Sequence, residues 1–119
     1  MAYQSFEDLD IWKSACRLAT DVYKNLKDCR DYGLKDQMTR AAVSIASNIA
    51  EGAERNSVKE YRHFLHIAKG SAAELRTQLY IASRIGLIGK STSADLVKET
   101  KIISSKTQAL VNSLNSPVS

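Results

Sequence analysis

Apolar side chains recur every three or four residues along most of the chain, which is the spacing of amphipathic helices. Short polar or glycine-containing segments interrupt the pattern and divide it into separate stretches. We predict helices at about 7–29, 34–54, 57–85 and 92–114. Such helices joined by short loops are typical of an all-α fold, here an antiparallel up-down-up-down four-helix bundle. The bundle is expected to form one domain over 5–114, with a loose tail at 115–119.

Each predicted helix places its apolar residues on one stripe, which should face the core. In the first helix this stripe is Leu9, Trp12, Cys16, Ala19, Tyr23 and Leu26, flanked by Ala15 and Val22. In the third helix it is Val58, Tyr61, Leu65, Ala68, Ala72, Leu75, Leu79 and Ala82. In the fourth helix it is Leu96, Thr100, Ile103, Thr107, Leu110 and Leu114. Gly70 lies within the third helix, where together with Ser71, Ala72 and Ala73 it predicts a close crossing with another helix.

Capping signals support two of the predicted helix starts. Ser57 with Glu60, and Thr92 with Asp95, have the spacing of a capping box, in which the two side chains satisfy free backbone amides. Gly86 is expected to end the third helix, because glycine readily adopts the left-handed conformation found there.

The stretch at 34–54 is rich in small side chains, which allow another backbone to approach closely. Its apolar flank consists of Ala41, Ala42, Ile45, Ile49 and Gly52. A neighbouring polar flank carries Ser44, Asn48 and Glu51. These three residues are candidates for a polar seam between subunits. The alternative is that they are small residues packed within one chain.

Charge is distributed unevenly. Residues 1–54 carry 7 Lys and Arg against 9 Asp and Glu, whereas residues 55–119 carry 10 against 4. In the basic half, cationic side chains spaced 4, 3, 4, 3 and 7 residues apart form what we call the basic stripe, on a face expected to lie well away from the apolar stripe. The basic stripe consists of Arg55, Lys59, Arg62, His66, Lys69 and Arg76. It is a candidate binding site for a polyanion. The alternatives are a solvated face and charge that serves solubility alone.

No motif supports catalysis, a cofactor or a metal. The chain has no glycine-rich phosphate loop and no nucleophile elbow. Glu60 and His63 have the Glu-x-x-His spacing of di-iron bundles, but such sites need two of these motifs and two further glutamates. The other histidine, His66, has His63 and not a glutamate three positions before it. We therefore expect a protein that is not an enzyme.

The N-terminal segment is acidic and lacks the apolar core of a signal peptide. No run of residues approaches the ~20 apolar positions of a membrane-spanning helix. Cys16 and Cys29, placed on one helix, would be ~20 Å apart along its axis, too far for a disulfide. Reduced cysteines and these absences indicate a cytoplasmic protein without a membrane partner.

Several strings of residues resemble a known family, the bacterial 23S rRNA intervening sequence proteins. They are Phe6-Glu-Asp-Leu-Asp-Ile-Trp, Ser44-Ile-Ala-Ser-Asn-Ile-Ala-Glu-Gly, Phe64-Leu-His-Ile-Ala-Lys-Gly-Ser, Glu74-Leu-Arg-Thr-Gln-Leu and Gly86-Leu-Ile. The resemblance covers about residues 5–114. The chain departs from it at Ala46, where the family often has proline, and at Ala53, where it often has an aromatic residue.

The resemblance implies an antiparallel four-helix bundle that assembles as a homopentameric ring. The family is similar to the accessory protein of diversity-generating retroelements, whose basic pentamer binds nucleic acid and a reverse transcriptase. It therefore implies self-association, RNA or DNA as a partner, and a reverse transcriptase as a further possible protein partner.

These observations together predict a non-enzymatic, oligomeric bundle whose basic stripe contacts nucleic-acid phosphates. The main alternative is a protein-interaction scaffold with an acidic protein partner and no nucleic acid. The stripe fits both, because both use charge steering. An enzyme is the third alternative, and it lacks any recognisable pair of acid and base.

Overall fold

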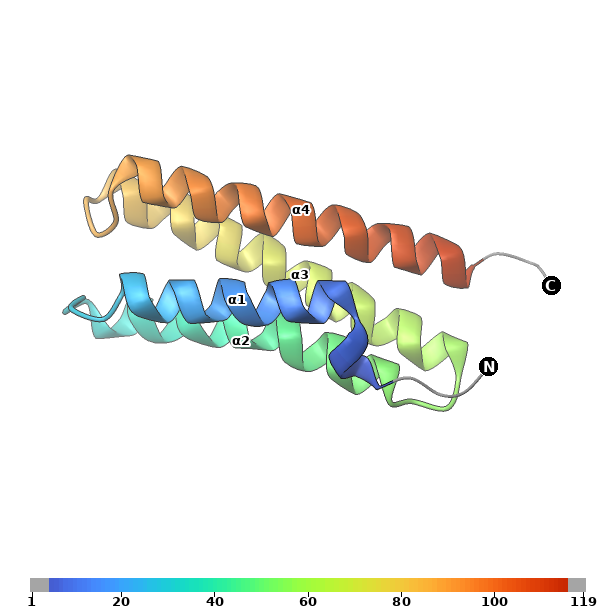
Figure 1. Cartoon of the computed structure of the whole chain (residues 1–119). Helices are drawn as coiled ribbons and strands as arrows, with labels where there is room; N and C mark the ends of the chain where they lie inside the picture. Colours follow the sequence, from blue (N-terminus) through green and yellow to red (C-terminus); the bar gives the residue numbers. More distant parts are fainter. Residues whose placement is uncertain (1–4, 116–119) are drawn as a thin grey trace.

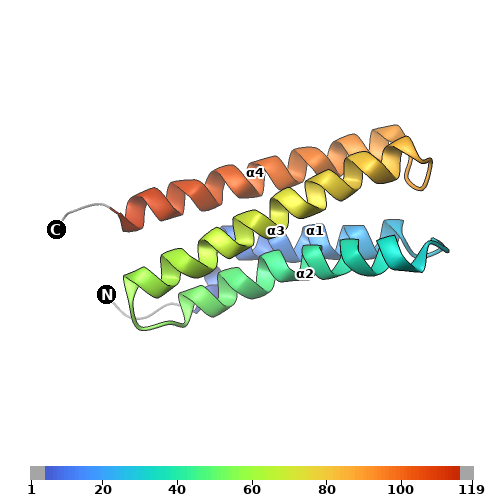
Figure 2. The ribbon, with the colours of Figure 1, turned by 180° about the vertical axis from the view of Figure 1, so that it is seen from behind.

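The computed structural model describes residues 5–115 and contains four long α-helices over that range (Figure 1). A 3-10 turn, η1 (Phe6–Asp8), precedes α1 (Asp10–Asn25), α2 (Tyr32–Ala53), α3 (Val58–Arg84) and α4 (Lys90–Leu114). Successive helices run antiparallel along a body of 50 × 20 × 19 Å (Figures 1 and 2). The predicted all-α, up-down-up-down bundle is therefore confirmed. The predicted tail lies outside the described residues beyond Asn115.

The starts of α2 and α3 are capped by side chains. The Oδ1 atom of Asp31 accepts a hydrogen bond from the amide of Leu34, 3.1 Å away. The Oγ atom of Ser57 accepts one from the amide of Glu60 at 3.0 Å, so this part of the predicted capping box is confirmed. The predicted capping box at Thr92 is wrong. Helix α4 begins earlier, with Gly89 as its N-cap and no side-chain cap.

The predicted helix at 7–29 is shorter and is broken near its start. Ser5 caps η1, and Leu9 then takes an extended conformation (φ −73°, ψ 125°) before α1 begins. At the other end, Leu26 leaves the helical region (φ −105°, ψ 7°) and closes α1. Helix α1 therefore accounts for the middle of the predicted range only.

The core contains apolar side chains from all four helices, among them Leu18, Ile45, Leu65, Leu75 and Ile103. Most of the predicted stripe of α3 is buried, from Leu65 to Ala82. None of the helices that the structure describes combines the length and the apolar character that a membrane span needs.

The core of α1 is centred one residue before the predicted stripe, on the side of its predicted flanks Ala15 and Val22, while Leu26 of the stripe is buried as predicted. The buried positions are Ile11, Ser14, Ala15, Leu18 and Val22, whereas Tyr23 is 52% exposed. The chain offers two apolar stripes with the same spacing, and the bundle buries the one that carries Ile11, Leu18 and Val22. The buried hydroxyl of Ser14 on this stripe accepts a hydrogen bond from Arg17 at 3.0 Å. Trp12 packs at the edge of the core, with its ring 5.2 Å from that of Phe6 at 73°. Cys16 is partly buried there, and burial raises the pKa of its thiol.

The closest approach of α2 to α3 is at Gly52, where their backbones converge before the turn. A Cβ atom at this position would lie 2.8 Å from Phe64 Cβ and 3.2 Å from the backbone oxygen of Tyr61. The predicted crossing around Gly70 involves its neighbours and not Gly70 itself, where a Cβ atom would meet nothing within 4 Å. Ser71 and Ala72 are buried, and the Ser71 hydroxyl lies 2.8 Å from that of Ser44 on α2.

A glycine turn joins α3 to α4. Gly86 has a φ of 79°, and the helix ends there as predicted. The amide of Leu87 bonds to the carbonyl of Ala82 at 2.9 Å, and that of Gly86 to Ser83 at 3.2 Å. This is the Schellman pattern, which satisfies the last carbonyl groups of a helix. The turn returns the chain directly along α3, so α4 packs mainly on that helix.

An ion pair links α4 to α1, which otherwise touch lightly. Lys106 Nζ lies 3.0 Å from Asp10 Oδ2, and both side chains are exposed. The hydrogen bond and charge of Lys106 hold the pKa of the Asp10 carboxyl below its ordinary value of 3.8. Since the folded pKa is lower than the unfolded one, the pair stabilises the fold above about pH 3.8 and this contribution is lost as pH falls through the folded pKa.

We expect Lys106→Gln to raise the pKa of Asp10 towards its ordinary value, because both main causes of its depression are removed. A carbon-detected NMR titration of the carboxyl group measures this directly. Lys98→Gln, which removes a charge elsewhere on α4, should leave the titration unchanged. An Asp10 pKa that does not respond to Lys106→Gln would contradict the ion pair.

Candidate nucleic-acid interface on the third and fourth helices

The basic stripe stays on one side of α3 but lies closer to the core than predicted. At 100° per residue, Lys59, Arg62, His66, Lys69 and Arg76 fall within an arc of about 100°. Lys59 and His66 are exposed, whereas the other three are partly buried. The partly buried residues therefore flank the core and do not lie well away from it.

Arg55 belongs to a local network at the corner between α2 and α3. Its guanidinium lies 2.8 Å from Glu51 Oε2 and 3.8 Å from Glu60 Oε1. It also covers the ring of Phe64, 4.7 Å from the centroid, as a cation–π contact. Two carboxylates balance its charge, so we assign Arg55 to the structure of the corner and exclude it from the free cationic surface.

Lys69 connects the stripe to α4 by donating a hydrogen bond to Gln108. This contact sets the antiparallel register of the two helices, and the hollow lined by both Tyr80 and Val97 gives the same register. The basic surface extends from α3 onto α4, because Arg84 of α3 lines the same hollow as Lys90, Lys98 and Lys101 of α4. The spacing of charges within one helix does not indicate this extension.

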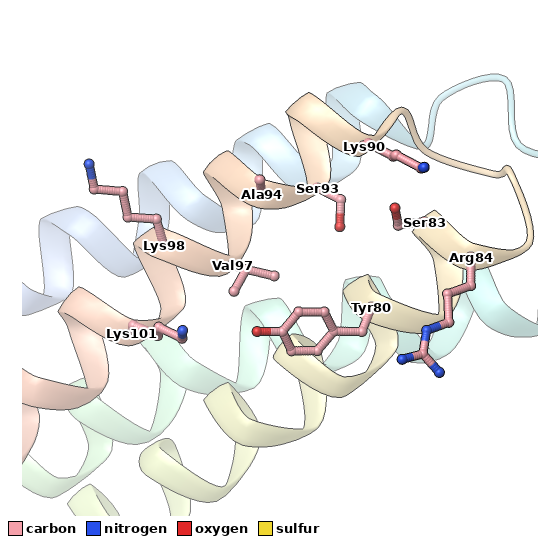
Figure 3. Close-up of a pocket in the computed structure, with 9 residues that line it drawn as sticks. All are labelled: Tyr80, Ser83, Arg84, Lys90, Ser93, Ala94, Val97, Lys98 and Lys101. Carbon is pink, nitrogen blue, oxygen red and sulfur yellow. The ribbon is translucent and has the colours of Figure 1, made fainter.

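A hollow of about 490 Å³ lies between the carboxyl end of α3 and the amino end of α4 (Figure 3). We call it the Tyr80 hollow. Helix α3 contributes Tyr80, Ser83 and Arg84, and α4 contributes Lys90, Ser93, Ala94, Val97, Lys98 and Lys101. Ser93 ties the two helices together at this end, because its hydroxyl donates to the carbonyl of Leu79 at 2.9 Å.

The cations of α3 and α4 form a continuous surface that we call the α3–α4 basic face. It consists of Arg62, Lys69, Arg76, Arg84, Lys90, Lys98 and Lys101. The stripe continues onto Tyr80 and Arg84, since both fall within the same arc of α3. The spacing of Lys90, Lys98 and Lys101 places them on one face of α4. Only the packed structure shows that this face adjoins the cations of α3.

The acidic residues of the basic half do not line the Tyr80 hollow. Glu60 is at the corner with Arg55. Glu74 lines a hollow on the α2 side with Asp36 and Arg40. Asp95 and Glu99 line another on the α1 side with Asp21, and Lys98 lines both that hollow and the Tyr80 hollow. The acidic residues of α3 and α4 therefore lie at the border of the face or away from it, and a mainly cationic face can bind phosphates.

The sequence matches the family described as 23S rRNA-intervening sequence protein over residues 7–109. The chain belongs to this family. The match confirms the resemblance found in the sequence motifs. A comparison with curated proteins finds no match.

A solved structure supports the fold of this family member. It is the crystal structure of a protein with unknown function from the S23 ribosomal protein family of Bacteroides thetaiotaomicron. The TM-score is 0.80 at 20% sequence identity, over 85% of this chain and 97% of that chain. At this level of identity the similarity shows a shared fold.

In this 23S rRNA-intervening sequence protein the predicted seam residues have partners within the chain. The hydroxyl oxygens of Ser44 and Ser71 are 2.8 Å apart. Asn48 Nδ2 donates to the carbonyl oxygen of Ser44 at 2.8 Å and to its hydroxyl at 2.9 Å. Glu51 pairs with Arg55. These contacts explain the polar flank of α2 as part of its packing against α3, and its role in a subunit seam stays a prediction.

The described residues hold no arrangement of three or more His, Cys, Asp or Glu side chains that could bind a metal. His63 lies beside Phe64, with ring centroids 5.5 Å apart, and His66 is exposed. Neither histidine pairs with a nucleophile in residues 5–115. The arrangement is suited to binding an anion by charge.

Proposed function

We propose that this protein is a non-enzymatic, cytoplasmic, oligomeric bundle that binds nucleic acid through the α3–α4 basic face. The observation that carries the proposal is the gathering of cations where α3 meets α4, since Arg84, Lys90, Lys98 and Lys101 line one hollow that no carboxylate lines. Phosphate contacts of this kind are independent of base sequence and release counterions on binding. The family name, which refers to rRNA, supports a nucleic-acid partner.

Fluorescence anisotropy with labelled RNA and DNA tests this function. Two unrelated sequences of equal length should bind with similar affinity, because contacts between cationic side chains and phosphates carry no sequence information. Absence of binding at low salt would contradict the proposal.

A pull-down with and without nuclease separates this function from the scaffold alternative. Nucleic-acid binding predicts that nuclease releases the captured material. An acidic protein partner that stays bound after nuclease treatment would favour the scaffold. The nuclease is needed because nucleic acid and an acidic protein would both associate with the face by charge.

We propose that the bundle assembles into a homopentamer, as the family resemblance implies. Light scattering should then give about five times the 13.2 kDa mass of one chain. Ile81 and Ile85 are exposed one turn apart on α3, and a contiguous apolar surface of this kind would support self-association. A species with the mass of one chain at micromolar concentration would contradict the pentamer. It would not contradict nucleic-acid binding by the α3–α4 basic face, which lies within one chain.

A further inference from the structure

The Tyr80 hollow differs from the rest of the α3–α4 basic face because it is concave and contains an aromatic ring. Its volume of about 490 Å³ falls in the range of ligand pockets, which is roughly 300–1,000 Å³. Figure 3 shows the ring of Tyr80 lying between the two helices, with its hydroxyl directed to the side of Lys101. The hollow therefore has room for a small ligand beside an aromatic surface.

Its charged lining has one sign. Arg84, Lys90, Lys98 and Lys101 are the ionisable cations that line it, and no carboxylate does. The amino end of α4 adds to this potential, because Gly89 provides no side-chain cap and the first turn has no acidic residue. Free amides and the helix dipole both favour an anion there, and phosphate suits them best. Phosphate groups would thus be held by both side chains and backbone.

Tyr80 is not explained by the core or by charge. It is 48% exposed, and other tyrosines of the chain are exposed as well, but it is the aromatic residue among those that line the hollow. Val97 and Ala94 of α4 line the hollow as small apolar surfaces. An exposed aromatic ring next to cations is the arrangement on which nucleobases stack while phosphates are neutralised.

We propose that the Tyr80 hollow binds a nucleoside phosphate, with the base stacked on Tyr80 and the phosphates against Lys90 and the amino end of α4. The ligand is either a free nucleotide or a nucleotide unit at the end of a strand, which share this chemistry. The inference does not rest on the proposed function, because one chain supplies the whole hollow and a free nucleotide would occupy it without any longer nucleic acid.

Isothermal titration calorimetry of the full chain with ATP, adenosine and inorganic triphosphate tests the proposal. ATP should bind with a Kd below about 1 mM. Adenosine and triphosphate should bind at least about tenfold more weakly, because adenosine has no phosphates to contact the cations and triphosphate has no base to stack on Tyr80. No binding of ATP at millimolar concentration would overturn the proposal. Triphosphate binding as tightly as ATP would also overturn it, since charge alone would then explain the site.

Variants separate stacking from charge. Tyr80→Ala should weaken ATP binding about tenfold, whereas Tyr80→Phe should retain it because the ring remains. Lys90→Gln with Lys101→Gln should also weaken it about tenfold. Lys13→Gln with Arg17→Gln on α1 removes the same charge elsewhere and should leave it unchanged. Equal loss in both double variants would overturn the site, and circular dichroism checks that each variant is folded.

A competition experiment distinguishes the two ligand sources. If a short 5′-phosphorylated oligoribonucleotide displaces ATP from the wild-type chain and displacement fails in Tyr80→Ala, the hollow takes the end of a strand. If the oligoribonucleotide binds without displacing ATP, the hollow takes a free nucleotide. An oligonucleotide that binds when ATP does not would overturn this inference while leaving the proposed function standing.

Discussion

Replacing Gly52 with alanine is expected to destabilise the fold by about 1 kcal/mol, which is the overpacking cost less the gain in helix propensity. Replacing a glycine within a helix by alanine usually stabilises the fold by roughly 1 kcal/mol, because alanine has the higher helix propensity. Here the new Cβ would lie 2.8 Å from Phe64 Cβ and 3.2 Å from the backbone oxygen of Tyr61. Neither atom is the end of a flexible side chain, so α2 and α3 must move apart at the corner. Overpacking of this kind typically costs about 1–3 kcal/mol.

Gly70→Ala is the matched control, because Gly70 is also helical but a Cβ there meets nothing within 4 Å. It should stabilise the fold by roughly 0.5–1 kcal/mol. Urea unfolding followed by circular dichroism at fixed protein concentration measures both variants. Equal stability of Gly52→Ala and the wild type would contradict the close approach of α2 to α3 at this point.

Neutralising Arg76 and Lys101 together is expected to weaken nucleic-acid binding roughly tenfold or more at 0.1 M salt, because each removes one phosphate contact. Arg76 is partly buried and Lys101 is exposed. No salt bridge or hydrogen bond joins either side chain to the rest of the described chain. Such substitutions usually alter stability by under about 0.5 kcal/mol, so the loss should reflect binding.

Arg62→Gln with Lys69→Gln, on the same stripe, tests whether the face extends along α3. It should weaken binding to a similar degree. Because Lys69 donates to Gln108, this pair also requires a check of stability by thermal unfolding. Binding that survives both double variants would place the contact elsewhere on the chain.

The fold followed from periodicity because each helix carries strong local signals. Ser57 caps α3 and Gly86 ends it, as their residue types predict. Periodicity failed where two stripes had equal spacing, as in α1, since only the packed bundle decides whether Leu18 or Tyr23 is buried. Gly89 as the cap of α4 gave no side-chain signal to be recognised.

The sequence predicts the part of the candidate site on α3 but not the part on α4. The cations of α3 share one stripe and could be recognised by spacing. Their completion by Lys90 and Lys101 depends on the register of α4 against α3, which no local pattern encodes. Arg55 fits the spacing of the stripe but is not part of the basic face. Its guanidinium pairs with Glu51 of α2 and Glu60 of α3, and a spacing pattern does not reveal such pairing.

The salt dependence of nucleic-acid affinity tests the account most directly. Anisotropy of a labelled single strand would be measured from low to high salt for the wild type, Arg76→Gln/Lys101→Gln, and the control Lys13→Gln/Arg17→Gln. Arg17 and Lys13 lie near Asp10, whose charge offsets theirs. We predict that the logarithm of the binding constant falls linearly with that of salt, and that the slope is shallower by roughly one to two units in the first variant alone. Affinity that does not change with salt, or one slope shared by all three proteins, would contradict a nucleic-acid interface on α3 and α4.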